Sequence, residues 1–259
     1  MQQLASNPGY LEFRGAPRVV VGSGEHYGAL LNADFDYHTY FRTLESAGLN
    51  QTRLFSGTYR ERPGHFGIEG NNLAPKPGRF ISPWLEVEAD RFDLDRFNPD
   101  YMPRLYDILE TASKHEVLVE LVLFCFWYGD DHWESSPMHP DRNVQGLGPR
   151  DRHRVYSVSG NDLLPVQERF VRMVVEAVNE YDNVYFEICN EPYSRHDGTA
   201  YLDWQHYMVD VIADIESRST ASHLIAVNYQ NRAYVIPEIH PAVSIANFHY
   251  ALPQAVYAN

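Results

Sequence analysis

Two glutamates stand close together in a stretch of the sequence that otherwise reads as a buried strand. Residues 185–193 read YFEICNEPY, which places Glu187 inside an apolar run and Glu191 between Asn190 and a proline. A carboxylate in a buried strand must find partners or shift its pKa. Two of them within five residues indicate chemistry as well as packing.

Strand geometry gives the two carboxylates different expected roles. Successive side chains of a strand point to opposite faces, so Glu187, Cys189 and Glu191 are expected on one face. Glu191 comes last and lies nearest the open end, where partial burial would raise its pKa toward working pH, as a general acid requires. Glu187 lies deeper and is expected to be a structural partner. The alternative for Glu191 is a strand-end residue that caps a loop or forms a salt bridge.

The elements that position these residues alternate regularly along the chain. Apolar strand runs are followed by segments with helical spacing, a pattern typical of parallel βαβ construction. Strands are expected at residues 18–22, 51–56, 117–124, 184–188, 223–227 and 243–248, with a short hairpin around 14–17 before the first. Helices are expected at 36–47 before Gly48, from Pro99 after an Asn98 cap, and around 166–178 and 204–215.

This alternation predicts an α/β protein with a (β/α)8 TIM barrel fold, incomplete in this chain, with about six βα units present. Residues 1–259 are expected to form one barrel domain. Six adjacent parallel strands are expected to contain Val19, Arg53, Leu123, Glu187, Ile225 and Ala246. In such barrels functional groups lie at the carboxyl ends of the strands, and the long connections 57–98 and 125–160 are expected to form binding walls there.

Charge and cysteine content limit the partners. The formal net charge of -14 argues against nucleic acid and an anionic membrane surface and favours a neutral substrate. The start of the sequence has no basic segment followed by an apolar one, and no run approaches the roughly 18 apolar residues of a membrane span. Cys125 and Cys189 form no CxxC motif, so reduced thiols and a cytoplasmic location are expected.

Three stretches of the sequence resemble one family of enzymes. The strand FEICNEP is similar to strand four of the clan A glycoside hydrolases, especially their cellulase-like family five. GLNQTRLFSG resembles their second strand with its inward arginine, and FDLDRFNPDYMPRLYDILETASKHEVLVELVLF resembles their second helix and third strand. The resemblance extends from about Val19 to Tyr250. It implies a barrel that cleaves β-glycosidic bonds in a glycan or oligosaccharide with retention of configuration, and no cofactor or metal ion is expected.

The resemblance implies roles for three residues. Breaking a glycosidic bond requires an acid that protonates the leaving oxygen and a second carboxylate that acts at the anomeric carbon. Glu191 matches the family's acid/base. Asn190 matches the asparagine that binds the sugar 2-hydroxyl, and its alternative role is turning the chain. Arg53 matches the arginine that orients the nucleophile and keeps it ionised, and it is also suited to neutralise the buried Glu187.

Four further residues are expected around the carbohydrate substrate. His249 ends the sixth strand, where the family often has a histidine, and its alternative is a core histidine. Trp127 lies in the second long loop, where an indole can stack on a sugar, and its alternative is packing. His26 and Tyr27 follow the first strand as candidate substrate contacts. The family's histidine after strand three is missing from FCFWYG, and Trp127 is the candidate for its space.

The family's nucleophile has no counterpart in this sequence. Retaining members of the clan place that glutamate at the end of strand seven, whereas the sequence ends at Asn259, a loop beyond strand six. Two further βα units need about 30 residues each. We therefore expect an incomplete chain of a longer enzyme, name no residue as nucleophile, and predict no oligomeric state.

Two other functions stay open at this point. A metal-dependent sugar isomerase or hydrolase would use strand-end glutamates and histidines as ligands. The sequence has no HExxH or other compact ligand spacing, and metal analysis of the purified protein distinguishes this function. A non-catalytic sugar-binding barrel would explain the missing nucleophile. The gene sequence downstream of Asn259 distinguishes that function.

Overall fold

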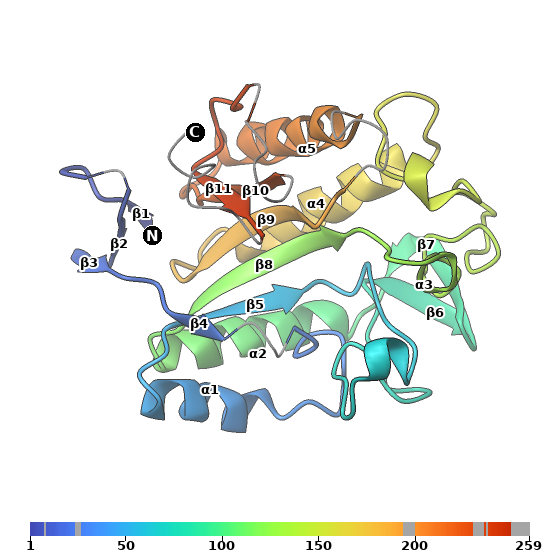
Figure 1. Ribbon diagram of the computed structural model, residues 1–259, viewed down its shortest axis with the longest axis horizontal. Helices are drawn as coiled ribbons and strands as arrows, with labels where there is room; N and C mark the ends of the chain where they lie inside the picture. Colours follow the sequence, from blue (N-terminus) through green and yellow to red (C-terminus); the bar gives the residue numbers. More distant parts are fainter. Residues whose placement is uncertain (8, 24–26, 194–199, 230–235, 237, 250–259) are drawn as a thin grey trace.

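A six-stranded parallel sheet forms the centre of the molecule (Figure 1). The computed structural model describes residues 1–7, 9–23, 27–193, 200–229, 236 and 238–249. The sheet order is β11, β10, β9, β8, β5, β4, and every neighbouring pair is parallel. The strands are Gly22–Ser23 (β4), Gln51–Phe55 (β5), Leu118–Cys125 (β8), Val184–Asn190 (β9), Ile225–Tyr229 (β10) and Ile245–Phe248 (β11). Strand order in space follows order in the chain, as in a section of a (β/α)8 barrel.

The sheet is curved, and side-chain contacts show its concave face. Arg53 of β5 contacts Glu187 of β9 although β8 lies between these strands. Asn247 of β11 donates to Glu187 at 2.8 Å although β10 lies between. Such contacts over an intervening strand are favoured where the sheet bends toward them. The fold is therefore a parallel half-barrel, which confirms the prediction of an incomplete barrel.

The first strand of the sheet differs from the prediction. The sequence predicts a core strand over residues 18–22, but only Gly22 and Ser23 pair with β5. Val19 lies outside the strands and is 68% exposed, so its predicted place in the sheet is wrong. The reason is Asn50, whose side chain accepts from Val21 N at 2.8 Å and donates to Val19 O at 2.9 Å. These bonds occupy backbone groups that a strand partner would use.

Helices follow the strands as the apolar spacing predicts. They are Tyr37–Ser46 (α1), Tyr101–Lys114 (α2), Leu164–Val178 (α4) and Ala200–Glu216 (α5). Asp36 caps α1 by accepting from Thr39 N, and Gly48 follows its end at φ 71°, where glycine is favoured. Helix α2 begins at Tyr101 and not at Pro99, because Asn98 closes a turn before it by accepting from Asp100 N.

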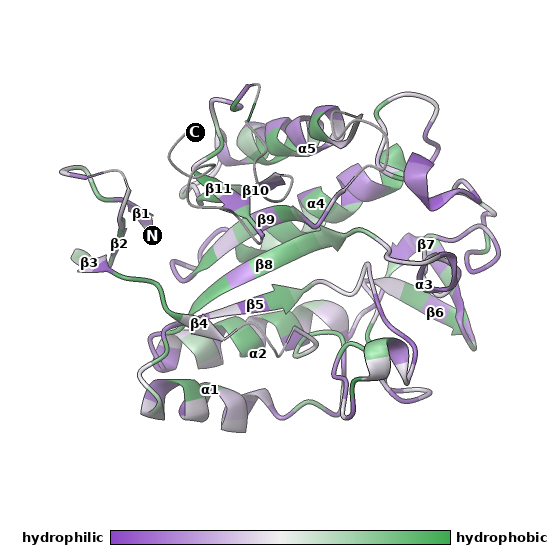
Figure 2. Ribbon diagram, in the orientation of Figure 1, coloured by the Kyte–Doolittle hydropathy of each residue, from purple (hydrophilic) through white to green (hydrophobic). Residues whose placement is uncertain are grey.

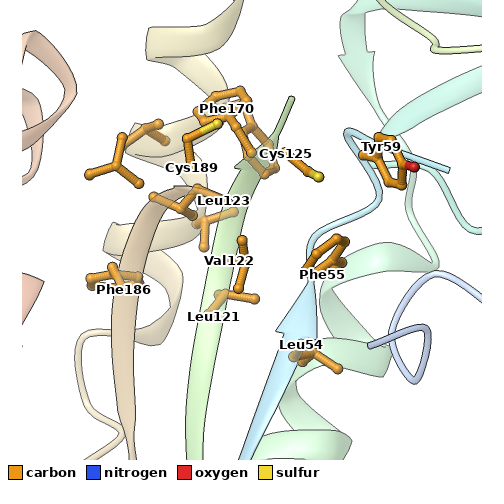
Figure 3. Packing of buried hydrophobic residues seen from close by; sticks show 14 of the residues in the cluster. Leu54, Phe55, Tyr59, Leu121, Val122, Leu123, Cys125, Phe170, Phe186 and Cys189 are labelled. Carbon is orange, nitrogen blue, oxygen red and sulfur yellow. The ribbon is translucent and has the colours of Figure 1, made fainter. Parts of the chain in front are cut away.

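The apolar core lies between the sheet and these helices. Strand β8 is buried along its whole length and is hydrophobic over most of it (Figure 2). Figure 3 shows apolar side chains of β5, β8 and β9 packed together with Phe170 of α4. The ring centroid of Phe124 lies 5.6 Å from that of Phe170 and 5.1 Å from that of Trp204 in α5. The core thus packs behind the carboxyl ends of β8 and β9.

Two smaller sheets flank the half-barrel at opposite ends (Figure 1). The predicted N-terminal hairpin is present, with Gln2–Gln3 (β1), Leu11–Phe13 (β2) and Ala16–Arg18 (β3). The first long loop contains the short helix His65–Gly67 (η1) and the hairpin of Trp84–Glu88 (β6) and Arg91–Phe97 (β7). The second contains Asp130–Trp133 (α3) and Arg152–Arg154 (η2). Both long loops lie beyond the carboxyl ends of β5 and β8, and the bridge between Phe92 and Asn143 joins them.

Membrane-spanning length and apolarity can be judged for the helices of the described residues. Each of these helices is too short or too polar to span a bilayer.

Candidate active site

Glu191 lies directly after β9, at the carboxyl edge of the parallel sheet. Its backbone φ is 48°, in the left-handed region that residues with a side chain rarely adopt. Such a conformation costs of order 1–3 kcal/mol and persists only where the surroundings hold it. Strained residues of this kind concentrate at functional sites.

Hydrogen bonds from distant parts of the chain hold Glu191. Its backbone N–H donates to Asn228 Oδ1 of β10 at 2.8 Å. The Tyr128 hydroxyl donates to Glu191 Oε2, and His249 Nδ1 lies 2.8 Å from Glu191 Oε1. Each oxygen of the carboxylate therefore has a hydrogen-bond partner, and the side chain of Glu191 is only 13% exposed.

These hydrogen bonds change the expected protonation of Glu191. Burial alone raises the pKa of Glu191, as the sequence predicts, but the hydrogen bonds from His249 and Tyr128 and the positive charge of Arg53 favour the anion. Their sum holds the pKa of Glu191 below its ordinary value, so the prediction of a raised pKa is wrong for this structure. The residues described here therefore position an ionised carboxylate.

Asn190 is the last residue of β9 and is buried. Its Nδ2 donates to Tyr128 Oη at 3.0 Å and lies 3.4 Å from Cys125 Sγ. Asn190 and Glu191 thus share Tyr128 as a partner. The side chain of Asn190 faces the group that holds Glu191, so its position is compatible with the role implied by the resemblance and that role stays a prediction.

Arg53 lies below Glu191 on the concave face, between two carboxylates. It forms ion pairs with Glu187 and, at 3.2 Å, with Glu120 of β8. The side chain of Arg53 is 12% exposed and that of Glu187 is fully buried. Burial and the negative charge of Glu120 raise the pKa of Glu187, while Arg53 opposes them. Arg53 pairs with Glu187 as predicted, but its single positive charge is shared between Glu187 and Glu120.

These residues belong to a larger set, which we call the polar ladder. Gln51 donates to Glu120 and to the Tyr185 hydroxyl, each at 3.1 Å, at its lower end. At its upper end Asn228 donates to Asn247 O at 3.1 Å and accepts from the backbone of Glu191. The polar ladder consists of Gln51, Arg53, Glu120, Tyr185, Glu187, Asn247 and Asn228. It runs across the concave face and ends at Glu191.

Tyr27 lies beside Arg53 at the same edge of the sheet. Its ring stacks on Phe55 with centroids 4.9 Å apart, and the Arg53 guanidinium lies 5.4 Å from the ring centroid. His26, its predicted companion, lies outside the described residues. Tyr27 is therefore near the predicted site, and its contact with a substrate stays a prediction.

Trp127 is a core residue and not an exposed sugar platform. It is 0% exposed and stacks on Tyr156 at a centroid distance of 5.2 Å, with Trp133 at 4.5 Å. A side chain enclosed in the core cannot offer a ring face to a sugar. The predicted substrate contact by Trp127 is therefore wrong for this structure. The space expected for Trp127 beside the strand-four glutamate is taken by its neighbour Tyr128.

Tyr128 and Asn228 are the residues that sequence reasoning missed. Asn228 lies inside the strand IAVNY and is 0% exposed, and a polar residue in a buried strand is itself a signal of a specific partner. The signal for Tyr128 is weaker. It follows β8 at the carboxyl edge, and its contact with Glu191 joins residues 63 positions apart.

A group of possible metal ligands lies next to this site. Within the described residues, the ligand atoms of His65, Asp131 and His132 lie within 4.8 Å of one another. Tyr128 lies between this group and Glu191, because its ring contacts His132 at a centroid distance of 6.2 Å while its hydroxyl reaches the carboxylate.

The half-barrel matches glycoside hydrolases of known structure. An endo-1,4-β-mannanase from Rhizomucor miehei has a TM-score of 0.57 at 15% identity, over 83% of this chain and 57% of that chain. An exo-β-1,4-mannosidase from Opitutaceae bacterium strain TAV5 has a TM-score of 0.58 at 15% identity, over 96% and 41%. An endo-1,4-β-D-mannanase from Thermotoga petrophila RKU-1 has a TM-score of 0.53 at 16% identity, over 85% and 58%.

These similarities confirm the fold that the sequence resemblance implied. The chain spans less than two thirds of the length of each of these three structures. No protein-family model matches the sequence, and no curated protein matches it.

Proposed function

We propose that this chain carries the acid/base half of a retaining β-glycosidase site, with Glu191 as the acid/base. The observation that carries the proposal is the way in which backbone conformation and side-chain partners fix Glu191 at the carboxyl edge of a parallel half-barrel. Its backbone is held at a φ of 48° and its carboxylate is fixed by Tyr128 and His249. A glutamate that only caps a loop needs neither the strain nor two side-chain partners.

Each neighbour has a part in the proposed reaction. Glu191 donates a proton to the leaving glycosidic oxygen in the first step and accepts one from water in the second. Tyr128 and His249 orient its two carboxylate oxygens, and His249 is close enough to exchange a proton with it. In the proposed reaction Asn190 hydrogen-bonds a sugar hydroxyl in exchange for its present bond to Tyr128.

The lowered pKa of Glu191 makes a second carboxylate part of the proposal. A general acid must hold its proton at working pH, whereas these neighbours favour the anion. A nucleophilic carboxylate about 5 Å away, as retention requires, would oppose that preference by like-charge repulsion. Formation of the glycosyl-enzyme then removes the negative charge and leaves Glu191 suited to act as a base.

The substrate class that we propose is a neutral polysaccharide of β-1,4-linked hexoses. The similar structures are named as β-1,4-mannanases and a β-1,4-mannosidase, so mannan and manno-oligosaccharides are the first substrates to test. A neutral polymer also suits a chain with a formal net charge of -14, because anionic glycans would be repelled.

The test is Glu191→Ala in the full-length protein. Hydrolysis of the natural glycan should fall by roughly 10²–10⁴, the usual contribution of general acid catalysis. An aryl glycoside with an activated leaving group needs little protonation, so its glycosyl-enzyme should form and accumulate. Azide should then restore turnover and yield a glycosyl azide of retained configuration. The matched control is Glu134→Ala, which removes a 57% exposed glutamate from the second long loop.

Other outcomes would reject the proposal. Near wild-type cleavage by Glu191→Ala, or an inverted product from the wild type, would exclude this role. Glycan binding without turnover by the wild type would favour a sugar-binding protein. Complete loss of wild-type activity with a chelator, as opposed to a partial loss, would favour a metal-dependent enzyme.

A further inference from the structure

A group of two imidazoles and a carboxylate joins the two long loops. His65 belongs to η1 in the first loop, and Asp131 and His132 belong to α3 in the second. His65 Nε2 lies 2.9 Å from Asp131 Oδ2, and the centroids of the His65 and His132 rings are 3.9 Å apart. The contact between loops joins residues 66 positions apart, so no compact motif in the sequence reveals it.

His132 provides a second and independent observation. Its side chain is buried, at 5% exposure, and its Nδ1 has no hydrogen-bond partner among the described residues. A buried polar nitrogen normally has a partner, because leaving it unpaired costs free energy. In the tautomer that carries its proton on Nε2, this unpaired nitrogen has a lone pair available to a cation.

We propose that His65, Asp131 and His132 bind a divalent transition-metal ion of the Zn²⁺ type. Neutral imidazole nitrogen suits zinc, copper, iron and nickel, whereas Ca²⁺ and Mg²⁺ prefer sites built from oxygen. Three protein ligands leave at least one coordination position for water. The site does not depend on the proposed role of Glu191, since none of its ligands contacts that carboxylate in the described residues.

Metal binding requires a rearrangement at His65. Its Nδ1 accepts the Arg62 N–H at 3.1 Å, so the proton of the neutral ring lies on Nε2, toward Asp131. A metal ion at Nε2 replaces that proton and requires a proton on Nδ1, so the bond from Arg62 must be released. The Arg62 amide should therefore report metal binding directly.

The metal ion would connect the two walls beside Tyr128. Phe66, next to His65, has ring contacts with His132 at 5.2 Å and with Tyr128 at 5.7 Å. Fixing His65 to α3 would also fix this aromatic group, on which the Tyr128 ring rests. The expected effect is a stiffer pair of loops and a better defined Tyr128.

The test uses the full-length protein without a histidine tag, with Zn²⁺ and Co²⁺ as probes. Calorimetry should show one Zn²⁺ per chain, Co²⁺ should develop visible d–d absorption bands, and the Arg62 amide resonance should shift. At a hundredfold excess of Zn²⁺ over its dissociation constant, the midpoint of thermal unfolding should rise by roughly 5–10 °C.

The variants for this test are His65→Ala and Asp131→Asn, because the buried His132 is a risk for folding. Each should weaken Zn²⁺ binding by about tenfold or more and remove the Co²⁺ bands, with an unchanged circular dichroism spectrum. The matched control is His240→Ala. His240 also pairs with an aspartate, at 3.0 Å, and lies near another histidine, at a ring distance of 5.3 Å. An absence of binding by the wild type, wild-type affinity in both variants, or loss of binding only in the control would overturn the proposal.

Discussion

Arg53→Met should destabilise the protein strongly, because it leaves Glu120 and Glu187 without their cation. The three side chains are 12%, 8% and 0% exposed, so water cannot replace the guanidinium. Removing one partner of a buried ion pair costs about 3–5 kcal/mol. For a chain of this size that corresponds to a fall of roughly 6–20 °C in the midpoint of thermal unfolding. Methionine keeps the apolar stem, so the loss reports the charge.

The matched control is Arg150→Met. Arg150 also pairs with a carboxylate through two nitrogens, at 2.9 and 3.0 Å from Asp141, but its side chain is 76% exposed. An ion pair in contact with water contributes little to stability, so this variant should unfold within a few degrees of the wild type. The double variant Arg53→Met/Glu187→Gln should recover part of the loss, since one buried charge is then absent.

The loss should also depend on pH. Burial raises the pKa of Glu187 above its ordinary value of 4.5 even with Arg53 present, and removing Arg53 raises that pKa further. The folded state then holds its proton while the unfolded state releases it, so stability falls as pH rises above about 4.5. Because the wild type also keeps this proton up to a pKa of about 8, the deficit of Arg53→Met should be constant between pH 4.5 and 8 and should grow as pH rises above about 8. Equal unfolding midpoints for the Arg53 and Arg150 variants, or a deficit independent of pH, would refute this account.

Two further predictions concern Tyr128 and Trp127. Tyr128→Phe removes a donor from the Glu191 carboxylate and should raise its pKa, so the alkaline limb of the pH–rate profile on the natural glycan should move to higher pH; an unmoved or more acidic limb would contradict this. Trp127→Ala empties a core site and should cost about 3–5 kcal/mol, measured by chemical unfolding. Unchanged stability with lost glycan affinity would instead restore the sugar-platform role of Trp127.

The strands after the first and the pair of Arg53 with Glu187 on the concave face were predictable, because they depend on local patterns. Period-two alternation within apolar runs places Arg53 and Glu187 on one face, and the buried charge of each requires an opposite partner. The helix bounds at Asp36 and Gly48 were predictable because capping uses the chemistry of neighbouring residues. These signals lie within a few positions of one another in the sequence.

The errors arose where distant segments compete for the same groups. Val19 has the composition of a strand residue, but the Asn50 side chain takes the backbone bonds beside it. Burial of Glu191 suggested a raised pKa, and its sign changed because donors arrive from other strands and loops, at Tyr128 and His249. Trp127 and Tyr128 are adjacent, and only the packing of the second long loop decides which ring enters the core.

The polar ladder has a consequence for anyone who wishes to redesign this protein. Its members share partners across five strands, so the effect of changing one depends on which residues occupy the others. A scan of single substitutions would therefore score most of these positions as intolerant. Libraries that vary Arg53, Glu120 and Glu187 together should recover apolar combinations that no sequence of single steps reaches. The polar residues of the concave face should therefore be substituted together and not one at a time. Asn228 must be kept, because it connects the polar ladder to Glu191.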